Sequence, residues 1–439
     1  MTMVLQIRYT GEGAGCVDTP VRLPLSKSMA LRMMMLNAVA DRQGRPMARL
    51  THGPETLPDD VEGLRHALQS LSERPRHNEI YIGEGGAPMR FFAAFAASVG
   101  GTDIVLTGSD GLCRRPMAIL IDTLREAGAR IECLAREGYP PLHISGATLS
   151  PAALGMNPGV SSQYISALML ASPLWESPLD LRLEGGATVS TPYLRMTADL
   201  MRRWGAEVTL TPDRVSVGNT LLASPESVEI EADWSAASYF YSLALLLPDR
   251  KIQIARLTPP ERSLQGDSAC AAIFGLLGVN TDYKEDSCAT LSCDRSIRDA
   301  MAACREPLQL DMGATPDLVP ALAVAMCLAG IRFRLFNIAH LKHKESDRLT
   351  ALANELQGIG YRVEAQPDAL LWDGGRYPVG EDIRVETYGD HRMAMAFASA
   401  AALLPYIAVE DPMVVDKSYP DFWDNLESLG FQLKSFGQR

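Results

Sequence analysis

The stretch LPLSKSMALRMMMLNAVAD, residues 23–41, predicts a helix that is buried on nearly every side. Beyond its first turn the only polar residues before Asp41 are Arg32 and Asn37, so the segment has no polar face to turn toward solvent. Lys27 and Arg32 nevertheless lie in its first two turns. Burying an unpaired cation costs roughly several kcal/mol, so a purely structural helix would avoid both residues. The start of this helix is therefore a candidate anion site.

The composition is that of a globular protein with room for two domains. The chain has 439 residues, of which 47% are hydrophobic and 21% charged, and at this length two cores are expected. It contains no apolar run of the roughly 20 residues that span a bilayer. It also starts with neither a signal nor a transit peptide, so we expect a cytoplasmic protein. A net charge of −12 argues against nucleic acid and membranes as partners.

The cysteines and histidines do not predict a metal site. The eight cysteines include no CxxC pair and no spacing typical of zinc ligands. His340, His343 and Glu345 lie in one short run, but three such residues are weak support for a metal site. We therefore expect no bound metal.

One pattern recurs along the chain, a helix that ends at a glycine and runs into a strand. In ALANELQGIGYRVEA, residues 351–365, Leu352, Leu356 and Ile359 have helical spacing and Gly360 is the expected left-handed stop. Glycines in the same place recur 70 to 82 residues apart, at Gly128, Gly205, Gly278, Gly360 and Gly430.

A second kind of helix is apolar on all sides. Six such segments start at intervals of 60 to 80 residues, near Ser26, Gly86, Ser161, Ser235, Thr315 and Asp390. Short runs between the helices, such as IVLTG (104–108) and IRFRLFNI (331–338), predict strands. The sequence therefore predicts six units of about 75 residues, each with a strand, a buried helix, a strand, an exposed helix and more strand.

Six units in two groups of three predict an α/β fold of two similar domains, with buried helices inside and sheets outside. The segment SVEIEADWSA, residues 227–236, passes from a strand to a new buried helix and places a boundary near residue 230. If the buried helices of a domain run parallel, their N-termini gather on one face. Each N-terminus carries about half a positive charge and free N–H groups, so the face would attract anions.

The polar residues of the buried helices cluster in their first turns. Taken alone, Ser235 and Asp390 are most simply N-caps. Capping does not explain Lys27 with Arg32, or His391 with Arg392, because cations are unfavourable at a helix N-terminus unless an anion is present. The first-turn residues are Ser26, Lys27, Ser28, Arg32, Gly86, Arg90, Ser161, Ser162, Gln163, Asp233, Ser235, Asp317, Asp390, His391 and Arg392.

Several of these segments resemble the motifs of the 5-enolpyruvylshikimate-3-phosphate synthase family. The resemblance begins with SKSMALR (26–32) and SSQYISALMLASP (161–173). It continues in family order through STPY (190–193), TPD (315–317), KESDR (344–348), YGDHRMAM (388–395) and VVDKSYPDFW (414–423). The resemblance spans nearly the whole chain, from about residue 20 to 426.

The resemblance implies a monomeric enzyme of the enolpyruvyl transferase fold, with three βαβαββ units in each of two domains. Residues 1–20 with 231–439 are expected to form a first, discontinuous domain that carries the phosphoenolpyruvate-side cations and the catalytic carboxylates. Residues 21–230 are expected to form the domain that binds shikimate 3-phosphate. The implied reaction adds the 5-hydroxyl of shikimate 3-phosphate to C2 of phosphoenolpyruvate and then eliminates phosphate. It needs no cofactor.

By motif position, the resemblance also assigns residues to the two substrates. Lys27 would contact both substrates, and Gln163 would lie between them. Shikimate 3-phosphate would be held by Ser28, Arg32, Ser161, Ser162, Ser190, Tyr193, His340 and Lys344. Phosphoenolpyruvate would be held by Gly86, Arg115, Arg348, Arg392 and Lys417, with Arg90 as a further substrate-binding residue. Arginine suits these anions because its planar guanidinium binds them in a bidentate way.

The same motifs assign the catalytic residues. Asp317 resembles the base that takes the hydroxyl proton, and Glu345 would handle the proton at C3 of phosphoenolpyruvate. Lys27 and Lys417 would assist the departing phosphate, and His391 is expected to belong to the catalytic set.

The glycine-rich segment GEGGAPMRF, residues 83–91, departs from the family pattern. Glu84 stands where the family has an amide, Ala87 where it has a threonine, and Pro88 alters the flank. Leu25 replaces a common glycine, and His340 replaces an asparagine that it can imitate as a hydrogen-bond donor. A carboxylate beside the phosphoenolpyruvate site would repel the ligand unless it is paired or turned away. We expect the enzyme to remain active.

Two alternatives stay open from the residues. A related enolpyruvyl transferase, the one acting on UDP-N-acetylglucosamine, uses a reactive cysteine, and Cys113 lies in the corresponding region, but Arg115 and Pro116 beside it resemble the shikimate enzyme. The second alternative is a noncatalytic sensor of a phosphorylated sugar acid. Asp317 and Glu345 oppose it, because extra carboxylates would not help to bind an anion.

Overall fold

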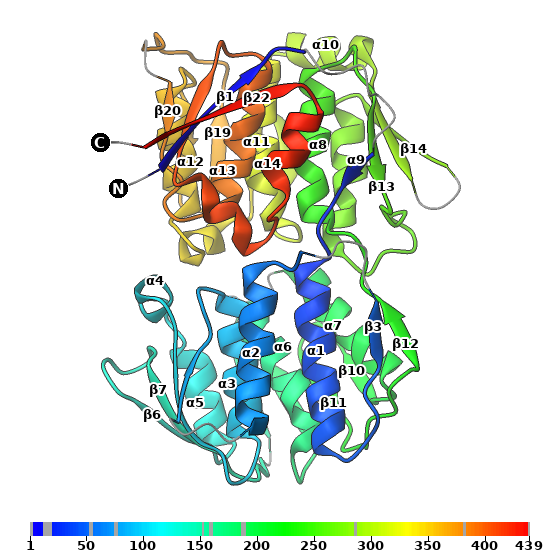
Figure 1. Cartoon of the computed structure of the whole chain (residues 1–439), viewed down its shortest axis with the longest axis vertical. Helices are drawn as coiled ribbons and strands as arrows, with labels where there is room; N and C mark the ends of the chain where they lie inside the picture. The colour runs from blue at the N-terminus through cyan, green and yellow to red at the C-terminus, as the bar shows by residue number, and fades with distance from the viewer. Residues whose placement is uncertain are drawn as a thin grey trace. The chain divides into compact units, whose positions relative to one another are not determined.

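The computed structural model describes residues 3–11, 20–51, 56–73, 78–151, 153–157, 161–185, 190–284, 288–380 and 383–437. Cys16 and the side chain of His343 lie outside this description. The chain divides into two compact units (Figure 1). The first unit comprises Met1–Leu25, Gly53–Thr56 and Glu231–Arg439, and the second comprises Ser26–His52 and Leu57–Ile230.

Most sheets of both units follow one topology. In the second unit β4 is parallel to β5, and β7 pairs antiparallel with both β5 and β6, which gives the order β4-β5-β7-β6. Helix α3 connects the parallel pair, since parallel neighbours require a crossover. The elements of this repeat are β4 (Glu79–Tyr81), α3 (Gly86–Ala97), β5 (Asp103–Thr107), α4 (Asp110–Cys113), α5 (Ala118–Glu126), β6 (Arg130–Cys133) and β7 (Leu142–Ser145).

Two more repeats have the same order of pairing. The second unit contains β8 (Leu154–Met156), α6 (Ser162–Ala171), η1 (Ser172–Leu174), β9 (Leu179–Leu183), α7 (Thr191–Arg203), β10 (Val208–Leu210) and β11 (Arg214–Val217). The first unit contains β16 (Leu308–Asp311), η4 (Pro316–Leu318), α11 (Val319–Ala329), β17 (Phe333–Phe336), η5 (Ala339–His343), α12 (Arg348–Gly358), β18 (Glu364–Ala365) and β19 (Ala369–Trp372).

Two repeats of the first unit take a strand from the start of the chain. Strand β1 (Met3–Tyr9) pairs between β21 and β22, and β2 (Val21–Arg22) pairs with β13. The other elements of one repeat are β20 (Arg384–Val385), α13 (His391–Ala398), η6 (Ser399–Ala402), β21 (Ile407–Glu410), η7 (Pro412–Lys417), α14 (Phe422–Ser428) and β22 (Phe431–Gly437). Those of the other are α8 (Trp234–Leu246), β13 (Ile252–Ala255), η2 (Gly266–Ala269), α9 (Cys270–Leu276), β14 (Val279–Tyr283) and β15 (Ala289–Cys293), followed by α10 (Arg295–Ala303).

The sixth repeat has a two-stranded sheet in the described part of the chain, where β3 pairs parallel with β12. Its elements are α1 (Lys27–Arg42), β3 (Arg49–Thr51), α2 (Asp59–Glu73) and β12 (Ser227–Glu229). The predicted fold class is confirmed, including the recurrence of one βαβαββ order along the chain.

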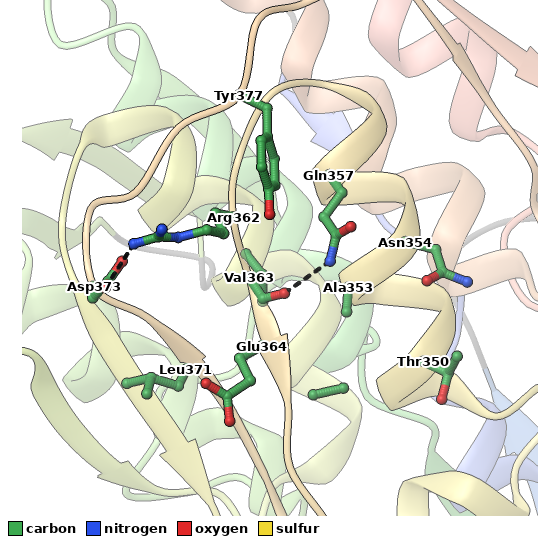
Figure 2. A pocket seen from close by; sticks show the side chains of 11 residues that line it. Thr350, Ala353, Asn354, Gln357, Arg362, Val363, Glu364, Leu371, Asp373 and Tyr377 are labelled. Atoms are coloured by element: carbon green, nitrogen blue, oxygen red, sulfur yellow. Dashed lines mark hydrogen bonds and ion pairs between the residues drawn. The ribbon is translucent and has the colours of Figure 1, made fainter.

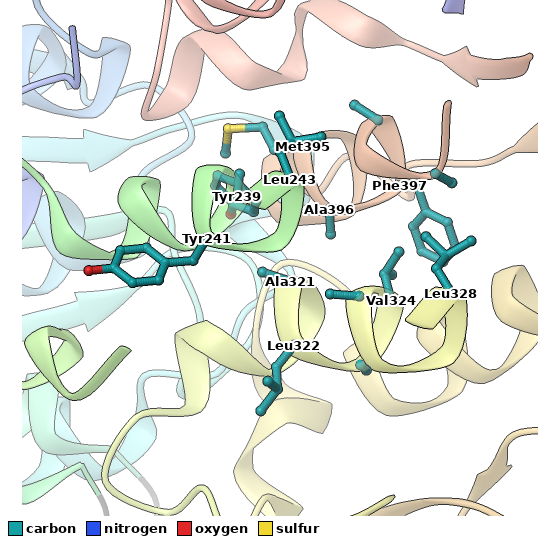
Figure 3. Close-up of a cluster of buried hydrophobic side chains, with 14 of the residues drawn as sticks. Tyr239, Tyr241, Leu243, Ala321, Leu322, Val324, Leu328, Met395, Ala396 and Phe397 are labelled. Carbon is teal, nitrogen blue, oxygen red and sulfur yellow. The ribbon is translucent and has the colours of Figure 1, made fainter. Parts of the chain in front are cut away.

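The apolar helices form the cores. Every residue of α8, α11 and α13 is buried, and Figure 3 shows Leu243, Val324 and Phe397 from these three helices in one cluster of the first unit. Each fully buried side chain of this size contributes roughly 1.5–3 kcal/mol. The helices therefore hold their first turns in place through packing along their whole length.

The predicted stop glycines are confirmed. All five have a φ in the left-handed region, which a residue without a Cβ adopts at little cost. The φ is 80° at Gly205 and lies between 88° and 102° at Gly128, Gly278, Gly360 and Gly430. Each lies two residues after the last residue of a helix (α5, α7, α9, α12 or α14) and before the next strand.

Candidate active site

Arg348, the first residue of α12, is the centre of a charged cluster in the first unit. Its side chain is 1% exposed and donates to Asp390 (Nε to Oδ2, 2.8 Å), Glu345 (Nη2 to Oε2, 2.6 Å) and Asp317 (Nη1 to Oδ1, 3.2 Å). Desolvation lowers the pKa of Arg348, but the three carboxylates outweigh it and raise the pKa above its usual value. Within KESDR, Arg348 is therefore the buried member of an ionic network, and Glu345 and Lys344 are its partly exposed members, whereas Asp347 is the exposed N-cap of α12.

Three cations lie close to the carboxylate of Asp317. Besides Arg348, the Nη2 of Arg392 in α13 lies 2.9 Å from Oδ2, and the Nζ of Lys344 lies 3.5 Å from Oδ1. Asp317 lies in η4, and its side chain is 14% exposed, while those of Arg392 and Lys344 are 10% and 24% exposed, so the cluster is only partly buried.

Asp390 caps α13, as predicted, by accepting from the backbone N–H of Arg392 at 2.9 Å. The residue before it, Gly389, accepts from the Nζ of Lys417 through its carbonyl at 2.8 Å. His391 is buried at the first position of α13. His340 lies partly buried in η5.

The expected cap role of Ser235 is wrong. Asp233 caps α8 by accepting from the N–H of Ala236 at 2.9 Å, and Ser235 lies inside the helix, where its hydroxyl donates to Asp267. Asp233 takes the cap because it directly precedes the first helical residue, Trp234, so its carboxylate can accept from the free N–H of Ala236 in the first turn.

Asp267 is a buried carboxyl that the sequence interpretation missed. It lies in η2, is 3% exposed, and burial together with the nearby charge of Asp317 raises its pKa to about 7. The hydroxyl of Ser235 and the guanidinium of Arg392 oppose that rise, and Asp233 adds to it. The available sequence signal was its place in the polar start of an apolar helix, SLQGDSACAA.

We expect Asp267→Asn to stabilise the protein more at pH 8 than at pH 5. The pKa of Asp267 in the folded protein lies above its value in an unfolded chain, so the free energy of unfolding that this group contributes is lost as pH rises toward 7. Asparagine carries no proton to lose and can still accept from Ser235. Melting temperatures of both proteins at the two pH values test this, with Asp282→Asn, an exposed position on β14, as control. An equal shift at both pH values would contradict the prediction.

A second group of charges lies in the second unit, at the starts of α1, α2 and α3. Lys27 is the first residue of α1, and its Nζ lies 2.8 Å from Oδ2 of Asp60 in the first turn of α2. A Cβ added at Gly85 would lie 2.7 Å from Oδ1 of Asp60, so this carboxylate also packs on the glycine-rich segment. Asp60 was not in the predicted set, because its pairing with Lys27 arises only in the folded unit.

The glycine-rich segment presents its backbone to two arginines. A Cβ added at Gly86 would lie 2.7 Å from Nη1 of Arg90 and 3.2 Å from Nη1 of Arg115. Arg90 also donates to Oε1 of Gln163 in α6 and lies over the ring of Tyr164, 5.3 Å from its centroid. The structure thus brings together four predicted residues, two arginines, a glycine and an amide, at the adjoining starts of α3 and α6.

Arg32 is buried among neutral groups. Its guanidinium donates to Thr197 Oγ1 at 2.7 Å, Ser28 O at 2.8 Å and Ser166 Oγ at 3.4 Å, and it lies over the rings of Phe91 and Tyr193. Desolvation lowers its pKa to about 10, a value at which the side chain remains charged at neutral pH. In the described part of the chain this cation contacts no carboxylate.

The predicted serines occupy helix starts in the second unit. Ser161 caps α6 by accepting from the N–H of Gln163 at 3.3 Å, and Ser162 follows it, buried. Ser190 precedes α7 with a φ of 55°. Capping explains Ser161. It does not explain Ser162, and Ser190 makes no side-chain cap bond to α7.

The pocket drawn in Figure 2 lies elsewhere in the first unit. It has a volume of about 490 Å³ and is lined by α12 residues such as Thr350 and Gln357 and by Arg362, Asp373 and Tyr377. None of the predicted site residues lines it.

Within the described ranges, no group of three or more His, Cys, Asp or Glu residues is arranged to hold a metal ion. Over the same residues, no helix combines the length and the apolar character needed to cross a membrane.

The family model and the curated relatives agree on one family, and a solved structure shares the fold. The sequence profile of EPSP synthase (3-phosphoshikimate 1-carboxyvinyltransferase) matches residues 12–426. A 3-phosphoshikimate 1-carboxyvinyltransferase of Bacteroides fragilis is 36% identical, and the alignment covers 98% of this chain and 99% of that protein. One of Methanospirillum hungatei is 32% identical over 92% and 94% of the two chains. The solved EPSP synthase of Acinetobacter baumannii has the same fold, with a TM-score of 0.71 at 20% identity over 99% and 100% of the two chains.

Proposed function

The chain belongs to the EPSP synthase (3-phosphoshikimate 1-carboxyvinyltransferase) family, and from this premise we propose which of its residues perform each step of that family's reaction. The reaction transfers the enolpyruvyl group of phosphoenolpyruvate to the 5-hydroxyl of shikimate 3-phosphate and releases phosphate. It requires cations for two phosphates and a carboxylate, a base for the hydroxyl and an acid for the methylene carbon.

Asp317 is the base in this proposal. The observation that carries the proposal is the position of its carboxylate among Lys344, Arg348 and Arg392. An anionic substrate would attract the same three cations. When they turn to the phosphate or carboxylate of a substrate, Asp317 loses its partners and becomes free to accept the proton of the hydroxyl that adds to C2.

Glu345 and Lys417 act on phosphoenolpyruvate. Arg348 and Arg392 bind this substrate, and the carboxyl of Glu345, 2.6 Å from Arg348, delivers and removes the proton at C3. The ammonium of Lys417, with that of Lys27, stabilises the negative charge that develops on the departing phosphate. His391, buried beside Arg392, belongs to this group.

The second unit supplies binding groups. Arg32 is buried with neutral partners, so its charge remains available to a phosphate. We assign it to shikimate 3-phosphate with Ser28, Ser161, Ser162, Ser190 and Tyr193 from the second unit and with His340 and Lys344 from the first. Gly86, Arg90 and Arg115 bind phosphoenolpyruvate, and Gln163 contacts both substrates. In this assignment the first unit carries the catalytic carboxylates. The proposal also takes the enzyme to work as a monomer in the cytoplasm.

The test is phosphate release from phosphoenolpyruvate, measured with and without shikimate 3-phosphate. We expect release only when both substrates are present, and none when shikimate replaces its 3-phosphate. Shikimate 3-phosphate that binds in a calorimeter without release of phosphate would overturn the proposed catalytic roles. A size-exclusion mass near 47.7 kDa would support the monomer, and twice that mass would contradict it.

A further inference from the structure

The turn between β20 and α13 is held in a strained shape. Tyr388 has a φ of 54° and Gly389 a φ of 64°, so two successive residues are left-handed. Glycine adopts this conformation easily, but for a tyrosine it costs roughly 1–2 kcal/mol. Such a conformation persists only where the surroundings impose it.

Helix α12 imposes it from both sides through two residues. Glu355 accepts from the hydroxyl of Tyr388 (Oε1, 2.7 Å) and from the backbone N–H of Glu386 (Oε2, 3.1 Å). Arg348, seven residues earlier and therefore on the same face of the helix, donates to Asp390. Burial raises the pKa of Tyr388 to about 12, so its hydroxyl keeps the proton that it donates.

The carbonyl of Gly389 in this turn binds the ammonium of Lys417. Gly389 O accepts from the Nζ of Lys417, the last residue of η7, at 2.8 Å. If Tyr388 relaxed to an ordinary backbone conformation, the chain would enter Gly389 in another direction, and the Gly389 carbonyl would be displaced. The lysine would then lose an acceptor that helps to orient its ammonium.

We propose that Glu355 is a positioning residue for Lys417, because it fixes the left-handed turn whose Gly389 carbonyl orients the lysine. The functional consequence rests on the role proposed above for Lys417 in phosphate departure. Glu355 itself touches no substrate in this proposal. Its effect on the rate is through the position of the Lys417 ammonium, and a misplacement of about 1 Å in a catalytic group can cost on the order of 100-fold in rate.

The test compares Glu355→Gln and Tyr388→Phe with Gln357→Ala as a matched control. Gln357 is on the same helix and also makes one bond to a neighbouring segment, from its Nε2 to the carbonyl of Val363 at 3.2 Å (Figure 2). We expect both test variants to lower kcat by about 10-fold with the KM for shikimate 3-phosphate unchanged. A further variant, Glu355→Leu, has no acceptor for either bond, so combining it with Tyr388→Phe should make the enzyme no slower than Glu355→Leu alone. Gln357→Ala should keep the wild-type kcat.

A second measurement does not depend on turnover. Limiting acetic anhydride is added to each folded protein, and the acetylation of every lysine is measured by mass spectrometry, with Lys251 and Lys434 as internal standards. Lys417 should react faster in Glu355→Gln and Tyr388→Phe than in wild type or Gln357→Ala. Faster acetylation with an unchanged kcat would support the positioning of Lys417 by Glu355 and would refute the proposed role of Lys417 in phosphate departure. Unchanged acetylation, with only a lower melting temperature, would overturn the inference. Should Glu355→Gln fail to fold, Tyr388→Phe, which keeps the ring, decides the same question.

Discussion

Asp317→Asn will lower kcat by roughly 1,000-fold, within the range of 10²–10⁴ that a positioned general base contributes. The variant keeps the shape of the side chain and an oxygen that can accept from Arg392. The substitution removes the one property that proton transfer needs, which is the ability of the carboxylate to take the hydroxyl proton. Binding of shikimate 3-phosphate should persist, because Arg32 and the serines assigned to it lie in other segments.

Single-turnover phosphate release measures the chemical step, and calorimetry with shikimate 3-phosphate measures binding. Asp311→Asn is the matched control, since Asp311 is an exposed aspartate that likewise accepts two hydrogen bonds, from Gly313 and Asn337. A kcat within tenfold of wild type for Asp317→Asn would assign the base to another group. Asp267 and Glu345 would then be the next candidates, because both are carboxyls that interact with members of the same cluster.

The helices and their ends could be predicted from the sequence because their signals are local. Leu352, Leu356 and Ile359 have a helical period, and Gly360 allows the left-handed exit whatever the rest of the chain does. The cations at apolar helix starts were informative for the same reason. Lys27 and Arg392 are unfavourable at an N-terminus on local grounds, so their presence required a partner.

Pairings across the fold could not be predicted in this way. The sheet position of β1, between β21 and β22, joins segments about 400 residues apart, and no local pattern in Met3–Tyr9 specifies it. The pairings of Asp60 and Glu355 could not be predicted for the same reason. Each lies in an ordinary amphipathic helix, where a carboxylate is expected on the solvent side. Their partners Lys27 and Tyr388 are 33 residues away in sequence.

Ser235 shows a different limit. Two candidate caps, Asp233 and Ser235, lie two residues apart, and propensity ranks them nearly equal. The helix begins at Trp234, so Asp233 is in the cap position, and Ser235, inside the first turn, donates its hydroxyl to Asp267. Local rules therefore identified the helix start and the polar cluster, and the tertiary contacts decided which residue does what.

Arg348→Met will destabilise the first unit by about 3–5 kcal/mol, the usual cost of breaking a buried ion pair by removing one partner. Asp390 is the reason for this large effect. Its side chain is 0% exposed, and Arg348 donates to both of its oxygens, so the variant leaves a buried carboxylate that the N–H of Arg392 and the hydroxyl of Ser346 satisfy only in part. Methionine fills the volume of the arginine stem, so loss of packing contributes little.

The double variant Arg348→Met/Asp390→Asn separates charge from structure. Asparagine is neutral and caps helices as well as aspartate does, so α13 should keep its start. If the uncompensated charge causes the loss, the double variant will be more stable than Arg348→Met alone. Hydrogen exchange in urea measures this for each unit, with peptides from α12 and α13 reporting on the first unit and peptides from α3 and α6 as the internal control. A double variant that is less stable than Arg348→Met would mean that the loss comes from the missing hydrogen bonds and not from the buried charge, because asparagine relieves the charge but cannot replace those bonds.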